Sequence, residues 1–402
     1  MLNTKNNLKG ARVTILNNSS FVYLFSIIIA WFLGEIIHNY LPKIPKVSIY
    51  LLVGFLFTQD IIGLIPNVHG ADIKFLVHIA FGLIVFECGY RVNLNWLKHN
   101  PYLILMTLLD AIVVFIIIYL ICNNWLIKNS TPSLIIATIA MSMSPIISLI
   151  VINQDQASGQ VSERILHLSL INFIFTILIF NLISNIWIYQ DQQNLHNLIY
   201  HGIISGILSI ALGLVMTLIT KYAFQTMGSI IKNTQMFITL AIILIITTAQ
   251  SIEIASILAI VTYGLASRYL NATTEFKQYQ FGILGELLTV FLFVVIGSTF
   301  VWHQWIIGII LAVLIIAIRI FSKMLFIIPL SYKSGISWTK ATLLGFATTP
   351  VSLFLIFSLN QLRQNHTTLF EQIAPISLAI FLLELFGPII IHYCLVSAKE
   401  IR

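Results

Sequence analysis

Two short clusters of hydroxyl and proline residues are the parts of this chain whose types and spacing could do chemistry. The first cluster holds Ser142, Ser144 and Pro145, and the second holds Thr348, Thr349 and Pro350. Each lies inside an apolar segment, where a proline removes one helical hydrogen bond and clashes with the preceding turn. Freed backbone groups in such a setting are tolerated only where protein, a ligand or a water-filled cavity meets them. The pattern therefore predicts two helices broken at Pro145 and Pro350, with binding groups at both breaks.

Four further polar residues lie deep in apolar segments, namely Asp110, Asn172, Arg319 and Glu384. Asn172 follows Glu163, at the start of its segment, by nine residues, which corresponds to a depth of roughly 13 Å at about 1.5 Å per residue. A charged side chain deep in a bilayer costs roughly 2.5 to 3.5 kcal/mol on insertion scales, so it must meet protein or water. These residues are candidates for the site that the broken helices build.

Each of the three charged residues has a functional and a structural interpretation. Asp110 is a functional acid or forms a hydrogen bond between helices. Glu384 is a titrating carboxylate or a protonated structural acid. Arg319 acts directly at the site, or is a counter-charge that neutralises an acid and braces the broken helices. Lys323, one turn after Arg319, is expected to extend its amine to the membrane interface.

Composition defines the class of protein. The chain has 402 residues, of which 58% are hydrophobic and only 9% charged, and its mean hydropathy is +0.97. Soluble domains carry about 25% charged residues, so this is an all-α polytopic membrane protein. The polar links are too short to hold a soluble domain with a nucleotide site or a catalytic constellation. We therefore expect neither an enzyme nor a cofactor.

Thirteen apolar segments are long enough, for the most part, to span a hydrocarbon core of about 30 Å. They cover residues 21–39, 47–65, 75–94, 101–122, 132–153, 163–188, 198–220, 234–250, 254–270, 281–300, 305–323, 338–360 and 372–396. This division leaves an N-terminal tail over residues 1–20, one transmembrane domain over residues 21–396 and a C-terminal tail over residues 397–402.

The net charge of +7 is best interpreted as topology. With the N-terminus outside, thirteen loop Lys and Arg residues lie on the cytoplasmic side and six on the other, which favours an N-out, C-in orientation. Basic residues are spread over short loops, so no nucleic-acid partner is expected. Glu35 interrupts the first apolar segment, which argues against a cleavable signal peptide. The cysteines, Cys88, Cys122 and Cys394, lie within or at the ends of segments, and no disulfide is expected.

The two breaks occupy the fifth and twelfth segments, seven apart, as an inverted repeat would place them. In such a repeat, helix ends of opposite partial charge meet at the membrane midplane and need balancing side chains. Under the same offset, the thirteenth segment corresponds to the sixth. Glu384 is then the counterpart of the Asn172 region.

Several motifs resemble the monovalent cation:proton antiporter superfamily, the Na+/H+ exchanger fold. The third segment ends in a similar Phe-Glu-x-Gly-x-x-x-x-Leu pattern, with Phe86, Glu87, Gly89 and Leu94 in place; Glu87 also stands four residues from Arg91, as an ion pair on one helix would. The break before Pro145 is followed by a similar Gly-x-x-x-Glu-Arg motif at Gly159, Glu163 and Arg164, and then by Asn172. Later segments carry a similar Gly264-Leu265 pair and a basic residue, Arg319, where the family places a Lys or Arg near its ion site.

The resemblance implies a homodimeric antiporter of about thirteen helices in inverted repeats, in a bacterial inner membrane, with a monovalent cation (Na+ or K+) and protons as its partners. It implies a core over about 75–188 and 281–396 and a scaffold over about 21–65 and 198–270. Ser142, Ser144, Asn172, Thr348 and Thr349 would line the site, Glu384 or Asp110 would carry the proton, and Arg319 would compete for that carboxylate or neutralise it.

One departure from the family pattern bears on function. Phe173 stands where the family has its ion-binding aspartate, and Leu168 stands where some branches keep a glutamate. Glu384 is then the candidate to replace the missing acid. Two alternatives follow from the same departure: an anion or organic-acid transporter on the same fold, or a non-transporting paralogue that acts as a sensor.

Overall fold

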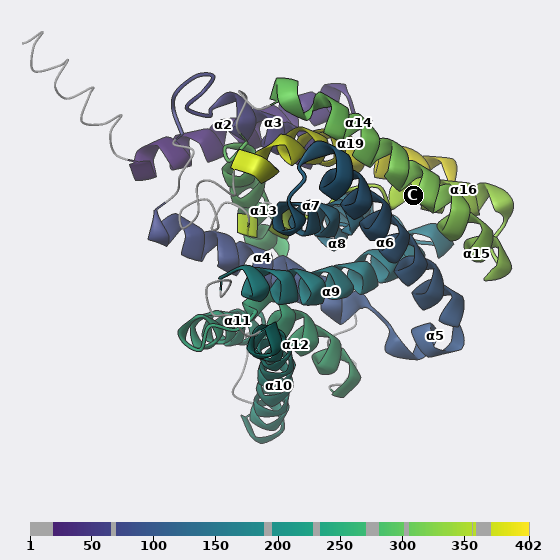
Figure 1. The fold of residues 1–402 in the computed structure, drawn as a ribbon. Coiled ribbons are helices and arrows are strands. Elements are labelled where there is room, and N and C mark those ends of the chain that lie inside the picture. Colours follow the sequence, from purple (N-terminus) through teal and green to yellow (C-terminus); the bar gives the residue numbers. More distant parts are fainter. Residues whose placement is uncertain are drawn as a thin grey trace, which may run out of the picture.

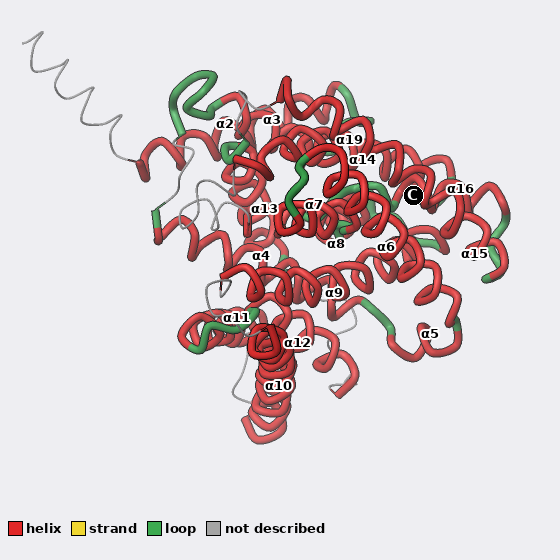
Figure 2. Tube along the Cα trace, viewed as in Figure 1, coloured by secondary structure: helices red, strands yellow, loops and turns green. Residues whose placement is uncertain are grey.

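The structure is a computed structural model, which describes residues 19–65, 70–188, 195–227, 234–270, 281–300, 305–355, 357–358 and 371–401. The predicted N-terminal tail therefore lies, except for residues 19 and 20, outside the described residues. The predicted end of the twelfth segment, beyond residue 358, lies outside them as well. Within the described residues the chain is helical with short connections and no β-strand (Figure 2).

The helices follow the apolar segments of the sequence closely. They are α2 (Ser19–Tyr40), α3 (Lys46–Leu56), α4 (Ala71–Arg91), α5 (Leu94–His99), α6 (Pro101–Ile121), α7 (Ser130–Met141), α8 (Pro145–Gln154), α9 (Gln160–Ile188), α10 (Leu195–Met227), α11 (Thr234–Ser251), α12 (Ser256–Leu270), α13 (Gly282–Gly297), α14 (Trp305–Ser322), α15 (Ile328–Lys333), α16 (Trp338–Ala347) and α19 (Ser377–Ser397). π-Helical turns extend α6 over Cys122–Leu126 and join α14 to α15 over Lys323–Ile327.

The described part contains eight helices long and apolar enough to cross a membrane, by length and composition, and three shorter apolar helices. The all-α membrane fold with two broken helices is confirmed, while the count of thirteen spans stays a prediction. Both predicted breaks are present, at residues 142–144 between α7 and α8 and at residues 348–352 after α16.

Two sequence-based boundaries are wrong. The second segment was predicted to continue to Ile65, but α3 ends at Leu56, and the chain turns back through Gly63, whose φ of +81° favours glycine. The eleventh segment was predicted to end at Lys323, but the helical path continues without interruption from Gly308 to Lys333. Lys323 is therefore in the interior of a long helix and cannot reach the interface as expected.

Figure 1 shows the helices in two groups around a centre formed by α7, α8 and α9. Helices α10, α11 and α12 lie together on one side, and α14, α15 and α16 lie on the opposite side. Helix α3 packs closely on α13, and α4 packs closely on α12. A Cβ on Gly54 would lie 2.2 Å from the Val294 carbonyl oxygen, and one on Gly264 would lie 2.6 Å from the Phe86 carbonyl oxygen. Only glycine allows backbones to approach this closely.

These crossings bear on the predicted division of the chain. Helices α4 and α13 fall within the predicted core, yet α4 packs on α12 and α13 packs on α3, both in the predicted scaffold. Helices α6 to α9 pack with one another and, through α6 and α9, with α14 and α16, and α9 also packs on α10. Helix α19 packs on α14, α16, α8 and α3. The division itself stays a prediction, and the packing favours different partners for α4 and α13.

Candidate functional site

The two breaks cross each other in the interior of the bundle. The backbone N–H of Ser144 donates to the carbonyl oxygen of Pro350 at 3.1 Å, and the backbone N–H of Ser352 donates to the Ser142 hydroxyl at 3.2 Å. The breaks therefore satisfy part of each other's freed backbone, which is the condition for unwound chain at this depth. Broken helices that meet in this way are the architecture of inverted-repeat secondary transporters.

Asn172 holds the first break in place. Its Oδ1 accepts from the backbone N–H of Met143 at 2.7 Å and from the Thr176 hydroxyl at 3.3 Å. Its Nδ2 donates to the carbonyl oxygen of Met141 at 3.1 Å. The amide thus binds on both sides of the break, and Asn172, which is fully buried, positions the site by supporting the unwound backbone.

Arg319 connects the two breaks. Its guanidinium donates to the carbonyl oxygen of Ala140 on α7 and, from Nη2, to the carbonyl oxygens of Thr349 at 2.8 Å and Pro350 at 3.4 Å. The side chain is buried, and its Nε has no hydrogen-bond partner among the described residues. This geometry matches the bracing role that the sequence left open for Arg319. The positive charge lies on the carbonyl oxygens that a bound cation would otherwise approach.

The hydroxyls of both clusters bond to their own helices. The Ser142, Thr348 and Thr349 hydroxyls donate to the carbonyl oxygens of Ile139, Gly345 and Phe346. The Ser144 hydroxyl accepts instead, from the backbone N–H of Ile147 at the start of α8. A hydroxyl that donates to its own helix keeps oxygen lone pairs free for another group. All four predicted hydroxyl residues are buried at the crossing.

Asp110 and Lys323 form a buried ion pair. Lys323 Nζ lies 3.0 Å from Asp110 Oδ2, and both side chains are almost fully buried. The neighbouring Ser322 hydroxyl donates to the Asp110 backbone carbonyl. Lys323 pairs with Oδ2 alone, and Asp110 Oδ1 is buried without a hydrogen-bond partner among the described residues. The ion pair favours the structural interpretation of Asp110 as a contact between helices. The prediction that Lys323 reaches the membrane interface is wrong. Its partner lies 213 positions away in the sequence, so no local pattern indicates the pair.

Glu384 is a fully buried acid whose two carboxylate oxygens, Oε1 and Oε2, both lack a hydrogen-bond partner among the described residues. It lies within electrostatic range of Arg319. One turn further along α19, a Cβ on Gly387 would lie 2.7 Å from the Pro350 ring, so this part of α19 packs directly on the second break. The structure thus has Glu384 in the same region as Arg319 and the crossing.

An aromatic cluster surrounds the position of the missing aspartate. The ring of Phe173 is fully buried and packs edge to face on Phe354 at 6.2 Å. Phe354 in turn packs on Phe81 at 5.9 Å, and Phe81 lies 5.9 Å from Phe357. In place of a carboxylate, the chain has apolar packing between α9, α4 and the segment after the second break.

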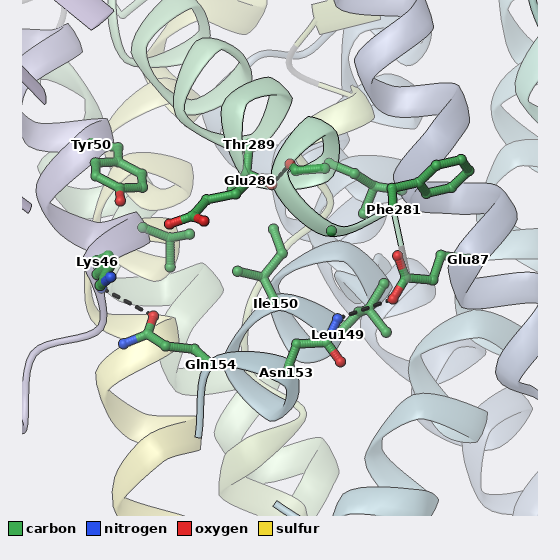
Figure 3. Close-up of a pocket in the computed structure, with 14 residues that line it drawn as sticks. Lys46, Tyr50, Glu87, Leu149, Ile150, Asn153, Gln154, Phe281, Glu286 and Thr289 are labelled. Atoms are coloured by element: carbon green, nitrogen blue, oxygen red, sulfur yellow. Dashed lines mark hydrogen bonds between the residues drawn. The ribbon is translucent and has the colours of Figure 1, made fainter. Parts of the chain in front are cut away.

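A cavity of about 320 Å³ opens between α8 on one side and α3, α4 and α13 on the other. Figure 3 shows Glu87 and Asn153 at one end, joined by a hydrogen bond of 3.0 Å, and Tyr50, Glu286 and Gln154 at the other. Glu87 also pairs with Arg91 at 3.2 Å, four residues along α4, as the sequence allowed. Among the described residues, none from the two breaks lines this cavity, so the crossing is closed off from it in this conformation.

Glu400, near the C-terminal end of the chain, binds the start of α9 and α16. The Glu400 carboxylate accepts from the backbone N–H groups of Val161 at 2.9 Å and Ser162 at 2.8 Å and from Lys340 Nζ at 3.2 Å. Burial alone would raise the pKa of Glu400, but these hydrogen bonds together lower it below its ordinary value of 4.5. The expected C-terminal tail is therefore bound to the start of α9. Sequence reasoning missed this contact, because a lone acid at the end of a chain carries no signal.

Comparison with known proteins agrees with this fold, and the family that it indicates is one of integral membrane transporters and not of enzymes. The chain belongs to the sodium/hydrogen exchanger family: the family's transmembrane region matches residues 23–396. No curated protein matches the chain in sequence.

Two solved structures of the sodium proton antiporter MjNhaP1 from Methanocaldococcus jannaschii have a similar fold. One, at pH 8, has 14% sequence identity and a TM-score of 0.72, and the match covers 93% of this chain and 98% of that one. The other, from electron microscopy, has 15% identity and a TM-score of 0.71, with 94% of each chain covered. The predicted superfamily is thereby confirmed.

Proposed function

We propose that this protein exchanges a monovalent cation, Na+ or K+, for protons by alternating access. The observation that carries the proposal is Glu384, a buried carboxylate without a hydrogen-bond partner in the described chain, beside Arg319 and the second break. A carboxylate in a dry environment keeps its charge only when a positive partner compensates it. A cation that reaches Glu384 can therefore replace its proton, and a returning proton can release the cation.

Arg319 sets the condition under which a cation can bind. Its guanidinium donates to the carbonyl oxygens of Ala140, Thr349 and Pro350, which belong to the ligand types that hard cations prefer. A cation must compete with this resident positive charge or bind on the Glu384 side of it. Asp110 is already paired with Lys323 at 3.0 Å, so Glu384 is the acid that we propose to carry the proton.

The packing supports a movement of two bundles against each other. We define the static bundle as α2–α4 and α10–α13, and the moving bundle as α6–α9, α14–α16 and α19. Helices α9 and α10, and α19 and α3, pack on each other across this boundary, so these contacts would have to slide. The cavity of Figure 3 lies between these bundles, with α3, α4 and α13 on one side and α8 on the other. Extending this cavity to the crossing in one state, and opening the opposite side of the bundle in the other, would give the crossing alternating access. The N-out orientation and the pairing of two copies stay predictions.

An anion or organic-acid transporter is the second candidate, and one observation favours it. Phe173 replaces the family's aspartate with apolar packing, while Arg319 keeps a buried positive charge at the crossing. If Glu384 stays protonated, the site is net positive and suits an anion. A sensor that binds an ion without moving it is the third candidate and follows from the same loss of the acid.

Proton flux in proteoliposomes separates these candidates. We would impose a pH gradient and add Na+, K+, Li+ and choline chloride in turn. The antiporter is expected to collapse the gradient with at least one alkali cation and not with choline. Flux that follows the anion and ignores the alkali cations would select the second candidate. Thermal stabilisation by an ion, without flux of any kind, would select the sensor.

The Glu384→Gln variant tests the residue that carries the proposal. Glutamine keeps the shape of the side chain and cannot exchange a proton, so cation-dependent flux is expected to fall to the level of empty liposomes. Glu371→Gln, which changes an exposed acid, is the matched control and should keep wild-type flux. Unaltered flux in Glu384→Gln would remove Glu384 from the mechanism.

A further inference from the structure

A second cavity, away from the crossing, is lined by charged and polar residues. It has a volume of about 460 Å³ and lies between the α4–α5 connection, the start of α9 and the end of α12. Its lining residues are Asn93, Trp96, Gly159, Gln160, Glu163, Arg164, His167 and Arg268. Among its described lining residues, two guanidinium groups face one carboxylate. It lies at the end of the bundle that the loop charges predict to be cytoplasmic.

Arg164 is buried at this cavity with unused donors. Its guanidinium lies 5.6 Å from the centre of the Trp96 ring and donates once, from Nη2, to the carbonyl oxygen of Ser334 at 3.0 Å. Its Nε is buried and has no partner in the described chain. A guanidinium has five N–H donors, and leaving a buried one unpaired is costly. An acceptor is therefore missing beside Arg164.

Arg268 faces the same cavity from α12. Its Nη1 donates to the backbone carbonyl oxygens of Tyr90 and Arg91, which fixes the guanidinium and leaves its other nitrogens for a ligand. Glu163 is exposed, and the ion pairs of the described residues do not join it to either arginine. The two positive charges are therefore held in place by backbone groups and are not neutralised by a direct carboxylate contact.

His167 lines the cavity as a neutral side chain that two hydrogen bonds hold in place. The backbone N–H of Asn93 can only donate, so His167 Nε2 accepts it, at 2.9 Å. The proton is then on Nδ1, which donates to the carbonyl oxygen of Glu163 at 2.7 Å. The first backbone N–H groups of α9 are already taken by Glu400, so the helix N-terminus does not supply the site. The charged hydrogen-bond donors among the described lining residues of this cavity are therefore those of Arg164 and Arg268.

We propose that this cavity binds a phosphate group through Arg164 and Arg268, with Trp96 and Asn93 beside it. Arginine is suited to phosphate because its planar N–H groups match two phosphate oxygens, and a volume of about 460 Å³ is within the usual size of a ligand site. The phosphate belongs either to the headgroup of an anionic phospholipid or to a free phosphate in the cytoplasm. The proposal is independent of transport.

Binding to the purified full-length protein in a neutral detergent, after removal of lipid, tests the proposal and separates the two sources. In one arm, thermal stability is measured against sodium phosphate, with sodium chloride at matched ionic strength. In the other arm, phosphatidylglycerol is titrated against phosphatidylcholine and bound lipid is counted by native mass spectrometry. Saturable binding of inorganic phosphate would assign a free phosphate, and binding of phosphatidylglycerol alone would assign a lipid headgroup.

Three variants locate the site. Arg268→Gln is expected to weaken binding about tenfold, since it removes a charge-assisted contact. Glu163→Gln should tighten binding a few-fold, because it removes the carboxylate among the described lining residues of the cavity. A gain of binding cannot come from misfolding, so this variant tests the site even if Arg268→Gln fails to fold. Lys98→Gln, which removes an exposed charge on α5, should change binding less than twofold. No saturable binding in either arm, or an equal loss in Lys98→Gln, would overturn the proposal.

Discussion

At the scale of single residues, two buried acids of this protein differ in their partners. Asp110 and Lys323 lie 3.0 Å apart and are nearly fully buried, whereas the Glu384 carboxylate has no hydrogen-bond partner in the described residues. A buried pair is weak evidence for stability in itself, but removing one partner strands the other charge. The pair should therefore behave as a unit when it is mutated.

Single and double variants of this pair have different expected costs. Asp110→Asn or Lys323→Met alone is expected to lower the free energy of unfolding by about 3 kcal/mol, because one buried charge loses its partner. The double variant should lose less than either single one. The measurement is unfolding of the purified protein in mixed micelles, with Lys98→Met as an exposed control expected to change the free energy by less than about 0.5 kcal/mol. Additive losses in the double variant would show that the two residues do not interact.

The residue scale also shows what sequence could and could not predict. The apolar context was enough to identify four site candidates, because a polar group at that depth is costly unless it meets protein or water. They are Asp110, Asn172, Arg319 and Glu384. The partners were not predictable, because Lys323 meets Asp110 across 213 positions. The length of its helix was also misjudged. The sequence therefore predicts Lys323 at the membrane interface, whereas the structure shows it buried in the interior of the bundle.

At the scale of elements, the end of the chain fastens the start of α9 to α16. Glu400 accepts from Val161 and Ser162 at the α9 N-terminus and from Lys340 on α16. A carboxylate at a helix N-terminus is favoured by hydrogen bonding and by the helix dipole together. The sequence predicted both helices, but it could not predict that a residue in the expected tail would cap one of them.

The Glu400→Gln variant and pH test this cap. The variant is expected to lower the free energy of unfolding by about 1 to 2 kcal/mol at pH 7, with Glu371→Gln as the control. The folded pKa of Glu400 lies below 4.5, so its stabilising effect is complete above the unfolded pKa and is lost as pH falls through the folded one. The difference between wild type and variant should therefore shrink from about pH 5 to about pH 3. A difference that does not change with pH would contradict a role for the Glu400 charge.

At the scale of the whole molecule, the inverted repeat was predictable and the packing partners of α4 and α13 were not. Two hydroxyl-proline clusters seven segments apart predicted the crossing that the hydrogen bonds of Ser144 and Ser352 confirm. The partners of α4 and α13 depend on close approach at Gly54 and Gly264. A glycine in an apolar segment does not reveal which helix it will meet, so sequence placed both helices in the core.

Cross-linking across the cavity of Figure 3 tests whether the two bundles move. Ile150 on α8 and Glu286 on α13 both line this cavity, and they belong to the moving and the static bundle respectively. We would introduce Ile150→Cys and Glu286→Cys together and join them with a cleavable bifunctional thiol reagent. The native Cys88, Cys122 and Cys394 are buried and should not react. If alternating access requires relative motion of α8 and α13, cross-linked protein should lose cation-dependent flux and regain it on cleavage. Each single-cysteine variant, treated in the same way, should keep its flux. Full flux in the cross-linked protein would mean that α8 and α13 stay together during the cycle, and the boundary between the bundles would have to lie elsewhere.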